Sequence, residues 1–388
     1  MNDVFIINYS RTPIGSFCSS MAGLSAADLG DQVLNEINKT FDIKLIEKGY
    51  IGQVLSAGCG QNVGREILYK NGCDIPVTTI NNVCGSGMQS IIEGTKSIKL
   101  GDFDCIIVGG TESMSNVPFL QKNVRKGNKY GNIQLIDGMM CDGLTDSFSQ
   151  KHMGEIAELL CEKNDITKED QNEYSKKSYI KAREAYKNEK FKNEIMKITL
   201  KSRNASVVID EDEEVNKNPD LNKIDTLRSA FKKDGTITAG NASKLSDGAC
   251  FLVLASQKFI EKHEIVPLAK ILAYDELSGP PETFPLLPVE GINKVCSKLD
   301  ITTDDIDCFE INEAFSMIPI MCHKKLNIPY DKINLYGGAI SMGHPLGCSG
   351  ARIVSTLLTI LNNEDKKLGC ASICNGGGGA TSMVIKII

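Results

Sequence analysis

One pattern occurs twice in this chain and limits what it can fold into. Each copy consists of a short apolar run of strand type, a loop, an apolar helical segment and a second apolar run that ends in Gly-Gly. The first copy runs from TTINNV through the loop with Cys84 to CIIVGG, and the second runs from KINLYGG through the loop with His344 to CASICNGG. A repeated unit of this kind indicates a repeated structure. We therefore predict a chain built from two similar halves.

Short apolar runs alternate with helical patterns through most of the chain, beginning with DVFIINY and SAADLGDQVLNEINKTF. After Cys84, several residues fall at helical spacing and give one apolar face for packing on a sheet: Met88, Ile91, Ile92, Thr95 and Ile98. This alternation is typical of α/β folds with largely parallel pairing. Between about residues 117 and 243 the sequence is more polar, and we interpret this segment as an insertion with amphipathic helices. Its acidic run IDEDEEVNKNPD is predicted to be a solvated turn.

Charge and hydropathy exclude several classes of function. The 388 residues carry a net charge of −6, so no basic surface for nucleic acid is expected. The longest apolar runs are of strand length, well short of the roughly 18 residues that span a membrane. The chain passes from Met1 directly into a strand-like run without a targeting peptide, so we expect a cytoplasmic protein whose 14 cysteines are reduced. The absence of CxxC pairs argues against structural zinc.

Cys84 is the first candidate for chemistry. It lies in NNVCGSGMQ, between a strand-like run and a helical segment, and small residues follow it. A helix N-terminus favours negative charge, so we expect the pKa of this thiol to lie below its usual value of about 8.5. The pattern predicts a nucleophile. The alternative is a buried structural cysteine, the ordinary role of any one cysteine among 14.

Two polar residues are candidates for assisting Cys84. His344 lies in a glycine-rich loop between Gly343 and Pro345, near a second predicted helix N-terminus, and could be the base that converts Cys84 to a thiolate. The alternative is a structural histidine. Asn312 follows an apolar run in FEINEAFS. Its amide could hold a water or bind an oxyanion, or it could simply cap the helix that follows.

A third candidate lies near the end of the sequence. In ASICNGGGGAT, Cys374 is followed after one residue by four consecutive glycines. Such bare backbone lets another molecule approach the amide groups closely, at an entropic cost that ordinary loops avoid. We therefore expect something to dock beside Cys374.

Taken together, these motifs resemble those of the thiolases, a superfamily of CoA-dependent acyltransferases. The resemblance covers essentially the whole chain, from SRTPIGSF and NNVCGSGMQS through TAGNASKLSDGA and NEAFS to GGAISMGHPLGCSGAR and CNGGGGA. FPLLPVEG and the ending ASICNGGGGATSMVI look most like the mitochondrial type of acetoacetyl-CoA thiolase. The resemblance implies a layered αβαβα thiolase fold of the α/β class, in which two similar halves each hold a mixed sheet and a loop domain is inserted.

The resemblance also implies domain boundaries and an assembly. Residues 1–116 and 244–268 would form the N-terminal half, residues 117–243 the loop domain for CoA binding and tetramerisation, and residues 269–388 the C-terminal half. The run NVRKGNKYGNIQLID resembles the loop through which two dimers join in tetrameric thiolases. We therefore expect a homotetramer whose ligands are acetyl-CoA, acetoacetyl-CoA and CoA, without nucleic acid or membrane partners.

For the reaction, the resemblance implies an acetyl-CoA C-acetyltransferase that reversibly condenses two acetyl-CoA molecules to acetoacetyl-CoA and CoA. Cys84 would carry the acyl group, His344 would activate Cys84, and Cys374 would move a proton to and from the α-carbon of the second acetyl group. The N–H groups of Gly376 and Cys84 would form one oxyanion hole, and His344 with a water held by Asn312 would form the other. No covalently bound cofactor is implied.

Several residues match positions near coenzyme A in the family. Ser243 in AGNAS matches the serine that contacts the pantetheine arm, and Lys223 matches a lysine near the nucleotide phosphates, with Lys217 as a less secure match. His152 matches a residue near the bound thioester. Leu159 departs from the family pattern, which has asparagine there, and one local contact is therefore in doubt.

In the branch that this chain resembles, a potassium ion lies beside the CoA site. The matching positions here are one tyrosine hydroxyl and four backbone carbonyls: Tyr179, Ala239, Gly240, Ala242 and Ile340. Neutral oxygen ligands suit a hard monovalent cation better than zinc. The alternative is that Tyr179 is an ordinary residue of an amphipathic helix.

Two other classes of function remain open from the sequence. Ketoacyl-ACP synthases share the fold and the nucleophilic cysteine but use two histidines, so His152 would have to be the second, and they lack a counterpart of Cys374. A non-catalytic CoA-binding or scaffold protein is the other alternative. Formation of a thioester from acetyl-CoA would exclude the scaffold.

Overall fold

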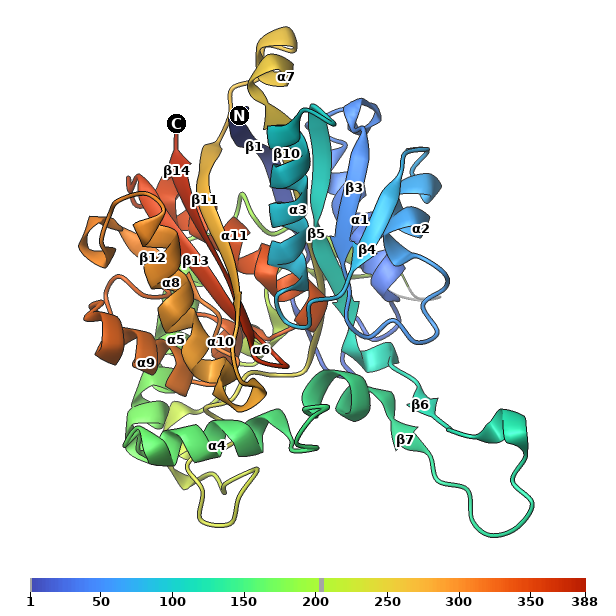
Figure 1. The fold of residues 1–388 in the computed structure, drawn as a ribbon, viewed down its shortest axis with the longest axis vertical. Helices are drawn as coiled ribbons and strands as arrows, with labels where there is room; N and C mark the ends of the chain where they lie inside the picture. The colour runs from blue at the N-terminus through green and yellow to red at the C-terminus, as the bar shows by residue number, and fades with distance from the viewer. Residues whose placement is uncertain (1, 202–205) are drawn as a thin grey trace.

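A computed structural model describes residues 2–201 and 206–388, so residue 1 of the predicted N-terminal half and residues 202–205 of the predicted loop domain lie outside the described residues. The main sheet has ten strands (Figure 1). Its first half has the order β4-β3-β5-β10-β1, with β2 paired to β10. In that order the strands are Val77–Ile80, Lys48–Gly52, Cys105–Ser113, Ser246–Ser256 and Val4–Arg11, and β2 is Gly15–Ser16.

The second half repeats this arrangement. Its strands follow the order β12-β13-β14-β11, with bounds Cys308–Ile311, Leu368–Asn375, Gly379–Ile387 and Ala269–Ser278. The pair β3/β5 in the first half and the pair β12/β13 in the second half are parallel. In each half the next two pairs along the sheet are antiparallel. Ile333 in KINLYGG forms a parallel bridge to Phe309 of β12, which gives this run the position of β4. The predicted internal repeat is confirmed.

Two details differ from the sequence-based expectation. The halves do not have separate sheets, because β1 and β11 pair through Phe5 with Lys270 and Ile6 with Ala269 and make the sheet continuous. The expectation of largely parallel pairing is also wrong: only β3/β4, β3/β5 and β12/β13 are parallel among the strand pairs of the main sheet in the described chain. Strands such as β14 return through a short turn rather than a crossover helix, and such a return must be antiparallel.

Helices lie in three layers around the strands. Helices α1 and α2 cover the first half, α8 covers the second half with α9 packed on it, and α3 and α11 lie between the two halves (Figure 1). These helices are Ala26–Ile37, Val63–Lys70, Leu287–Ser297, Met317–Leu326, Ser86–Leu100 and Leu346–Asn363, and the short helices α7 and α10 are Gln257–Lys262 and Ala339–Met342. The predicted apolar face of α3 is buried as expected. The αβαβα layering follows from this arrangement.

The two central helices approach each other closely because glycine lies on both sides of their contact. A Cβ atom at Gly87 of α3 would come within 2.6 Å of the backbone nitrogen of Ala351, and one at Gly350 of α11 would collide with the backbone nitrogen of Met88. Backbone atoms cannot move aside as a side chain can. The small residues that follow Cys84 and His344 therefore let the two helix N-termini meet.

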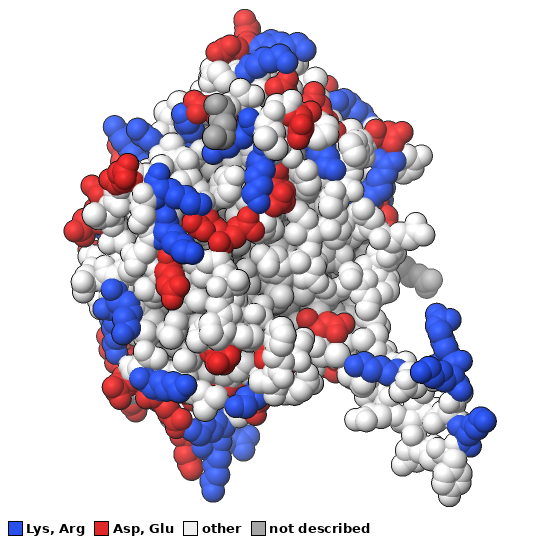
Figure 2. Space-filling view, in the orientation of Figure 1, with Lys and Arg blue, Asp and Glu red and all other residues white. Residues whose placement is uncertain are grey.

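The insertion adds no strand to the main sheet within the described ranges. Its strands form two small ribbons, β6/β7 and β8/β9, and its helices are α4, α5 and α6. The bounds are Phe119–Leu120, Ile136–Asp137, Ile198–Lys201, Ser206–Ile209, Met153–Lys163, Lys168–Lys187 and Glu213–Asn216. The β6/β7 hairpin projects away from the body, and lysine and arginine side chains gather at its end (Figures 1 and 2).

The acidic run in the insertion is not a solvated turn, contrary to the prediction. Asp212 is fully buried, and its carboxylate accepts two hydrogen bonds from Arg11 of β1, at 2.7 and 3.0 Å. Arg11 is also fully buried and bonds Glu194. Because a buried charge needs a partner, this cluster fixes the insertion to the end of β1. No helix within residues 2–201 and 206–388 is long and apolar enough to cross a membrane.

The contact between α3 and α11 predicts a cost for a single added methyl group. Gly87→Ala should lower the free energy of unfolding by about 1–3 kcal/mol, since the methyl meets backbone that cannot yield. Gly23→Ala is the matched control, because Gly23 is exposed and has no atom within 4 Å of a built Cβ. Thermal or urea unfolding of both variants measures the difference. Equal stability of the two variants would contradict the proposed role of this contact.

Candidate active site

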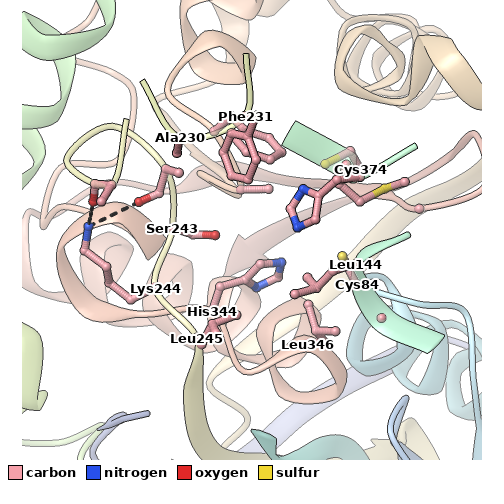
Figure 3. A pocket seen from close by; sticks show the side chains of 18 of the residues that line it. Cys84, Leu144, Ala230, Phe231, Ser243, Lys244, Leu245, His344, Leu346 and Cys374 are labelled. Atoms are coloured by element: carbon pink, nitrogen blue, oxygen red, sulfur yellow. Dashed lines mark hydrogen bonds between the residues drawn. The ribbon is translucent and has the colours of Figure 1, made fainter. Parts of the chain in front are cut away.

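A cavity of about 460 Å³ opens where the N-termini of α3 and α11 meet the turn between β13 and β14. Its lining includes most of the residues predicted from the sequence: Cys84, His152, Ser243, His344, Cys374 and Gly376, together with Ala239 and Ala242. The side chains of Cys84, His344 and Cys374 face this one cavity (Figure 3). The two copies of the internal repeat thus contribute Cys84 and His344 at equivalent positions.

Cys84 lies directly before Gly85, the N-cap of α3, on a turn in which Val83 has the left-handed φ of 46°. Such a φ is costly for a β-branched residue and fixes the direction of the turn. Burial has the largest effect on this thiol and raises its pKa to about 11, although the backbone N–H groups of Gly376 and of Cys84 itself act in the opposite direction and lower it. The predicted lowering of this pKa is therefore wrong, because desolvation outweighs the helix N-terminus.

His344 lies directly before Pro345, the N-cap of α11, and its side chain is almost fully buried. Its Nδ1 lies 2.6 Å from Oγ of Ser349, and that hydroxyl donates its hydrogen to the carbonyl of Pro345 at 2.8 Å. A hydroxyl has one hydrogen, so Ser349 must accept from Nδ1–H. This bond fixes the tautomer and leaves Nε2 unprotonated.

The charge state of His344 follows from its surroundings. Burial, followed by the nearby positive charge of Arg352, lowers the pKa of His344 to about 3. The imidazole is therefore neutral at physiological pH. A neutral imidazole with an unprotonated Nε2 can accept a proton.

Asn312 follows β12 and is fully buried. Its Oδ1 lies 3.5 Å from Nη2 of Arg352, so the amide is oriented with Nδ2 toward Nε2 of His344, at 3.4 Å. The alternative that Asn312 caps a helix is wrong, because α9 begins at Met317 with Ser316 as its N-cap. Asn312 instead faces the reactive nitrogen of the histidine.

Cys374 is buried on β13 and faces the same cavity. Burial, followed by the charge of Cys84, raises the pKa of Cys374 well above its usual range. Gly376 lies just beyond the strand, where an added Cβ would come within 3.1 Å of Val83 Cγ1. The first glycine of the run thus packs against the turn that carries Cys84.

The predicted CoA-site residues divide into two groups. Ser243 and His152 line the cavity, and the imidazole of His152 stacks on Phe231 with ring centres 4.7 Å apart. Nδ1 of His152 accepts from the N–H of Gly154 at 3.0 Å, which caps α4. Lys223, in the 3₁₀ turn Leu221–Thr226, is exposed and does not line the cavity, and Leu159 is 37% exposed on α4.

Of the positions matched to potassium, Tyr179, Ala242 and Ile340 belong to one buried cluster. The carbonyls of Ala239 and Ala242 both accept hydrogen bonds from Nζ of Lys244. Burial lowers the pKa of Lys244, and the charge of Glu214 partly offsets this effect. Two of the oxygens expected to bind a metal ion thus have an ammonium group as their partner, and an added cation at this position does not fit beside it.

Several residues of the site were not found from the sequence. The apolar wall of the cavity includes Met153, Phe231, Phe284, Phe315 and Leu346. These residues have no polar pattern that could mark them. Below the site, Arg352 pairs with Glu310 at 3.1 Å, and both side chains are buried. Arg352 lies in the quoted motif GCSGAR, and an arginine on the apolar segment ARIVSTLLTIL was the available signal.

Glu112 of β5 was also missed. Its carboxylate accepts from the N–H of Gly347 at 2.9 Å and from the N–H groups of Val54 and Leu55 at 3.0 and 3.1 Å. Burial raises the pKa of Glu112 to about 7. It holds the start of α11 against the loop after β3, so it positions His344 from the other half of the molecule.

The arrangement is suited to acyl transfer. It combines a thiol, a neutral imidazole with an unprotonated Nε2, two N–H groups at the sulfur and a second thiol in one apolar cavity. A cysteine and a base are the groups that form a thioester, and fixed N–H groups stabilise the negative oxygen that appears during the attack. Within the described ranges, no cluster of three histidine, cysteine or carboxylate residues could hold a metal ion.

Comparison with known proteins gives matches over the whole chain. The acetyl-CoA acetyltransferase ERG10, cytosolic, of Gibberella zeae is 41% identical over 99% of this chain and 98% of its own length. The acetyl-CoA acetyltransferase of Candida albicans is 42% identical over 99% of this chain and 97% of its own length. The crystal structure of the Acat5 thiolase from Ascaris suum in complex with coenzyme A superposes with a TM-score of 0.93, at 40% identity, and covers 100% of both chains.

Two family domains account for nearly all residues. The thiolase N-terminal domain matches residues 4–258, and the thiolase C-terminal domain matches residues 265–387. The division falls in the chain between β10 and β11, the first of which belongs to the first half of the sheet and the second to the other half. By this coverage and by the identity to its relatives, the chain belongs to the thiolase family.

Proposed function

We propose that this protein is an acetyl-CoA C-acetyltransferase, which reversibly condenses two acetyl-CoA molecules to acetoacetyl-CoA and CoA. The observation that carries the proposal is that Cys84, His344 and Cys374 line one cavity. Support also comes from the relatives named acetyl-CoA acetyltransferase, at 41 and 42% identity. The three residues have separate roles in two half-reactions.

In the first half-reaction, Nε2 of His344 takes the proton of the Cys84 thiol, and the resulting thiolate attacks the thioester carbonyl of acetyl-CoA. The N–H groups of Cys84 and Gly376 would stabilise the negative oxygen, since both lie close enough to the attacking sulfur to lower its pKa. The bond between the acetyl carbon and the CoA sulfur then breaks. The CoA thiolate takes the proton of Cys374, which leaves protonated His344 beside a Cys374 thiolate.

In the second half-reaction, the Cys374 thiolate removes a proton from the methyl group of a second acetyl-CoA. Protonated Nε2 of His344 keeps its proton and, with a water held by Asn312, donates a hydrogen bond to the enolate oxygen. The enolate carbon attacks the acetyl group on Cys84 and forms acetoacetyl-CoA. The Cys84 sulfur leaves and takes its proton from His344, so all groups return to their starting states.

Coenzyme A would lie along the cavity between the insertion and the body. Ser243 would contact the pantetheine arm and His152 the thioester, since both line the cavity. Lys223, on the exposed 3₁₀ turn, would bind the nucleotide phosphates. The 40% identical Ascaris suum thiolase, whose structure contains coenzyme A, supports this part of the proposal. Potassium is left out of it, because Lys244 bonds two of the carbonyls matched to the ion.

The proposal extends to the assembly, the domain division and the location. The β6/β7 hairpin exposes apolar side chains that a partner would cover: Phe119, Val124, Tyr130, Ile133 and Leu135. Such a surface on a projecting segment favours a homotetramer joined through this hairpin. Residues 117–243 would then serve CoA binding and assembly, between halves formed by residues 1–116 with 244–268 and by residues 269–388. One relative is named cytosolic, which supports a cytoplasmic location.

Substrate length tests the proposed activity. Acetoacetyl-CoA should be cleaved efficiently in the presence of CoA, and 3-ketoacyl chains beyond about six carbons poorly, because each misplaced methylene costs about 10- to 200-fold at an apolar wall. The wall includes Met153 and Phe284. Initial rates with acetoacetyl-CoA, its 2-methyl derivative and a long-chain 3-ketoacyl-CoA measure the preference. Efficient cleavage of the long chain would show that the substrate is assigned wrongly.

The two cysteines should differ when each is removed. Cys84→Ala should release no CoA from acetyl-CoA, while Cys374→Ala should still release about one equivalent in a burst, since His344 can return its proton to CoA. Turnover of Cys374→Ala should fall by about 10²- to 10⁴-fold, the usual size of a general acid/base contribution. Stopped-flow detection of free CoA measures both. Cys18→Ala, at an exposed cysteine outside the cavity, is the control, and full turnover of Cys374→Ala would refute its role.

Burial of Cys84 predicts how its alkylation depends on pH. Because the pKa of Cys84 is raised to about 11, its thiolate fraction should rise about tenfold per pH unit through pH 10 without a plateau. The alkylation rate of glutathione, a free thiol, should reach its plateau about two to three pH units lower under the same conditions. Iodoacetamide labelling of the Cys84 peptide, followed by mass spectrometry, gives the rates. A plateau near neutral pH would mean that the thiol is ionised before substrate binds.

A further inference from the structure

The turn that carries Ser243 has a charged group fixed inside it. This turn, residues 238–244, leads from the insertion into β10. The Lys244 side chain folds back along it, and Nζ donates to the carbonyls of Ala239 and Ala242, the latter at 3.4 Å (Figure 3). Ser243 lies between the bonded residues and faces the cavity. These hydrogen bonds thus close a ring that contains Ser243, the residue expected to contact pantetheine.

The backbone of Lys244 ties the same turn to the reactive histidine. The carbonyl of Lys244 accepts from the N–H of His344 at 3.0 Å and from Oγ of Ser246 at 2.9 Å. The N–H of Ser243 donates to the carbonyl of Ala314 at 3.0 Å. The turn is therefore anchored on both sides. Loss of the hydrogen bonds made by Nζ would leave these backbone bonds of Ser243 and Lys244 in place but would loosen the rest of the turn.

The charges around the turn are already balanced by protein groups. Glu214 lines the same cavity and lies near enough to Lys244 to favour its charged form. Oε1 of Glu214 accepts from Oγ of Ser16 at 2.6 Å and from Nζ of Lys217 at 2.8 Å, which holds the carboxylate in place. A mobile cation is not needed to offset it.

A second fixed cation lies beside Tyr179. The guanidinium carbon of Arg183 is 5.8 Å from the centre of the Tyr179 ring, and Nη2 of Arg183 donates to the carbonyl of Pro219 at 2.6 Å. Two of the four carbonyls matched to potassium, and the tyrosine, therefore have a protein cation as their neighbour. An added monovalent ion would meet repulsion from both and would find two of its carbonyls occupied.

We infer that the ammonium group of Lys244 takes the place of a potassium ion in this chain and holds the Ser243 turn in its CoA-binding form. An ammonium carries the same charge as the ion and offers three N–H donors to carbonyl oxygens. Charge-assisted bonds of this kind are among the stronger ones in proteins. Since the group is covalently attached, the turn is held at any potassium concentration. Lys244 is a positioning residue, and the inference about CoA rests on the proposed function.

The test has one part that needs no variant and no catalysis. The melting temperature of the wild-type chain without substrate, and its dissociation constant for CoA by calorimetry, should be equal in potassium chloride and in sodium chloride at the same ionic strength. Tighter CoA binding or a higher melting temperature in potassium would overturn the inference. This result is independent of whether the chain cleaves acetoacetyl-CoA, so failure of the proposed activity would be seen separately.

The second part removes the charge and keeps the length of the side chain. Lys244→Met should weaken CoA binding on the order of tenfold, the size expected for loss of a charge-assisted hydrogen bond, while kcat for acetoacetyl-CoA cleavage changes less than about threefold. Lys262→Met is the control, because Lys262 is exposed on α7 and does not line the cavity. CoA affinity of Lys244→Met equal to that of Lys262→Met would overturn the inference, as would a loss confined to kcat.

Discussion

The site depends on a backbone contact between two helices that belong to different halves of the chain. Gly87 of α3 and Gly350 of α11 leave no side chain at the crossing, so the helix N-termini approach each other closely. Cys84 and His344 occupy the same position, one residue before the N-cap, on these helices. A duplicated unit has thus placed two different side chains at equivalent points, and the close crossing brings them to one cavity.

Burial sets the chemistry of that cavity. It raises the pKa of Cys84 to about 11 and lowers the pKa of His344 to about 3, so the resting pair is a neutral thiol and a neutral imidazole. Ionisation would be coupled to the attack on the thioester, because burial disfavours a resting thiolate more than the two N–H groups near the sulfur favour it. This arrangement avoids an isolated thiolate, which would be costly in an apolar site.

The sequence predicted features that have local signatures. The repeat, the helix after Cys84 and the positions of Cys84, His344 and Cys374 in one cavity could all be predicted from spacing, glycine content and resemblance. What could not be predicted depends on partners far away in the chain. The sequence predicts a solvated Asp212, because nothing local shows that its partner Arg11, 201 residues earlier, buries it. The pKa of Cys84 was misjudged because burial is a tertiary property.

Peptide mapping after incubation with acetyl-CoA tests the central claim most directly, since it detects the acetyl thioester that Cys84 is proposed to form. The protein is mixed with acetyl-CoA, quenched in acid to preserve thioesters, digested and examined by mass spectrometry. The account predicts one acetyl group per chain, on the peptide that contains Cys84, with the other 13 of the 14 cysteines unmodified. An acetyl group on Cys374, or no acetylated cysteine at all, would contradict it.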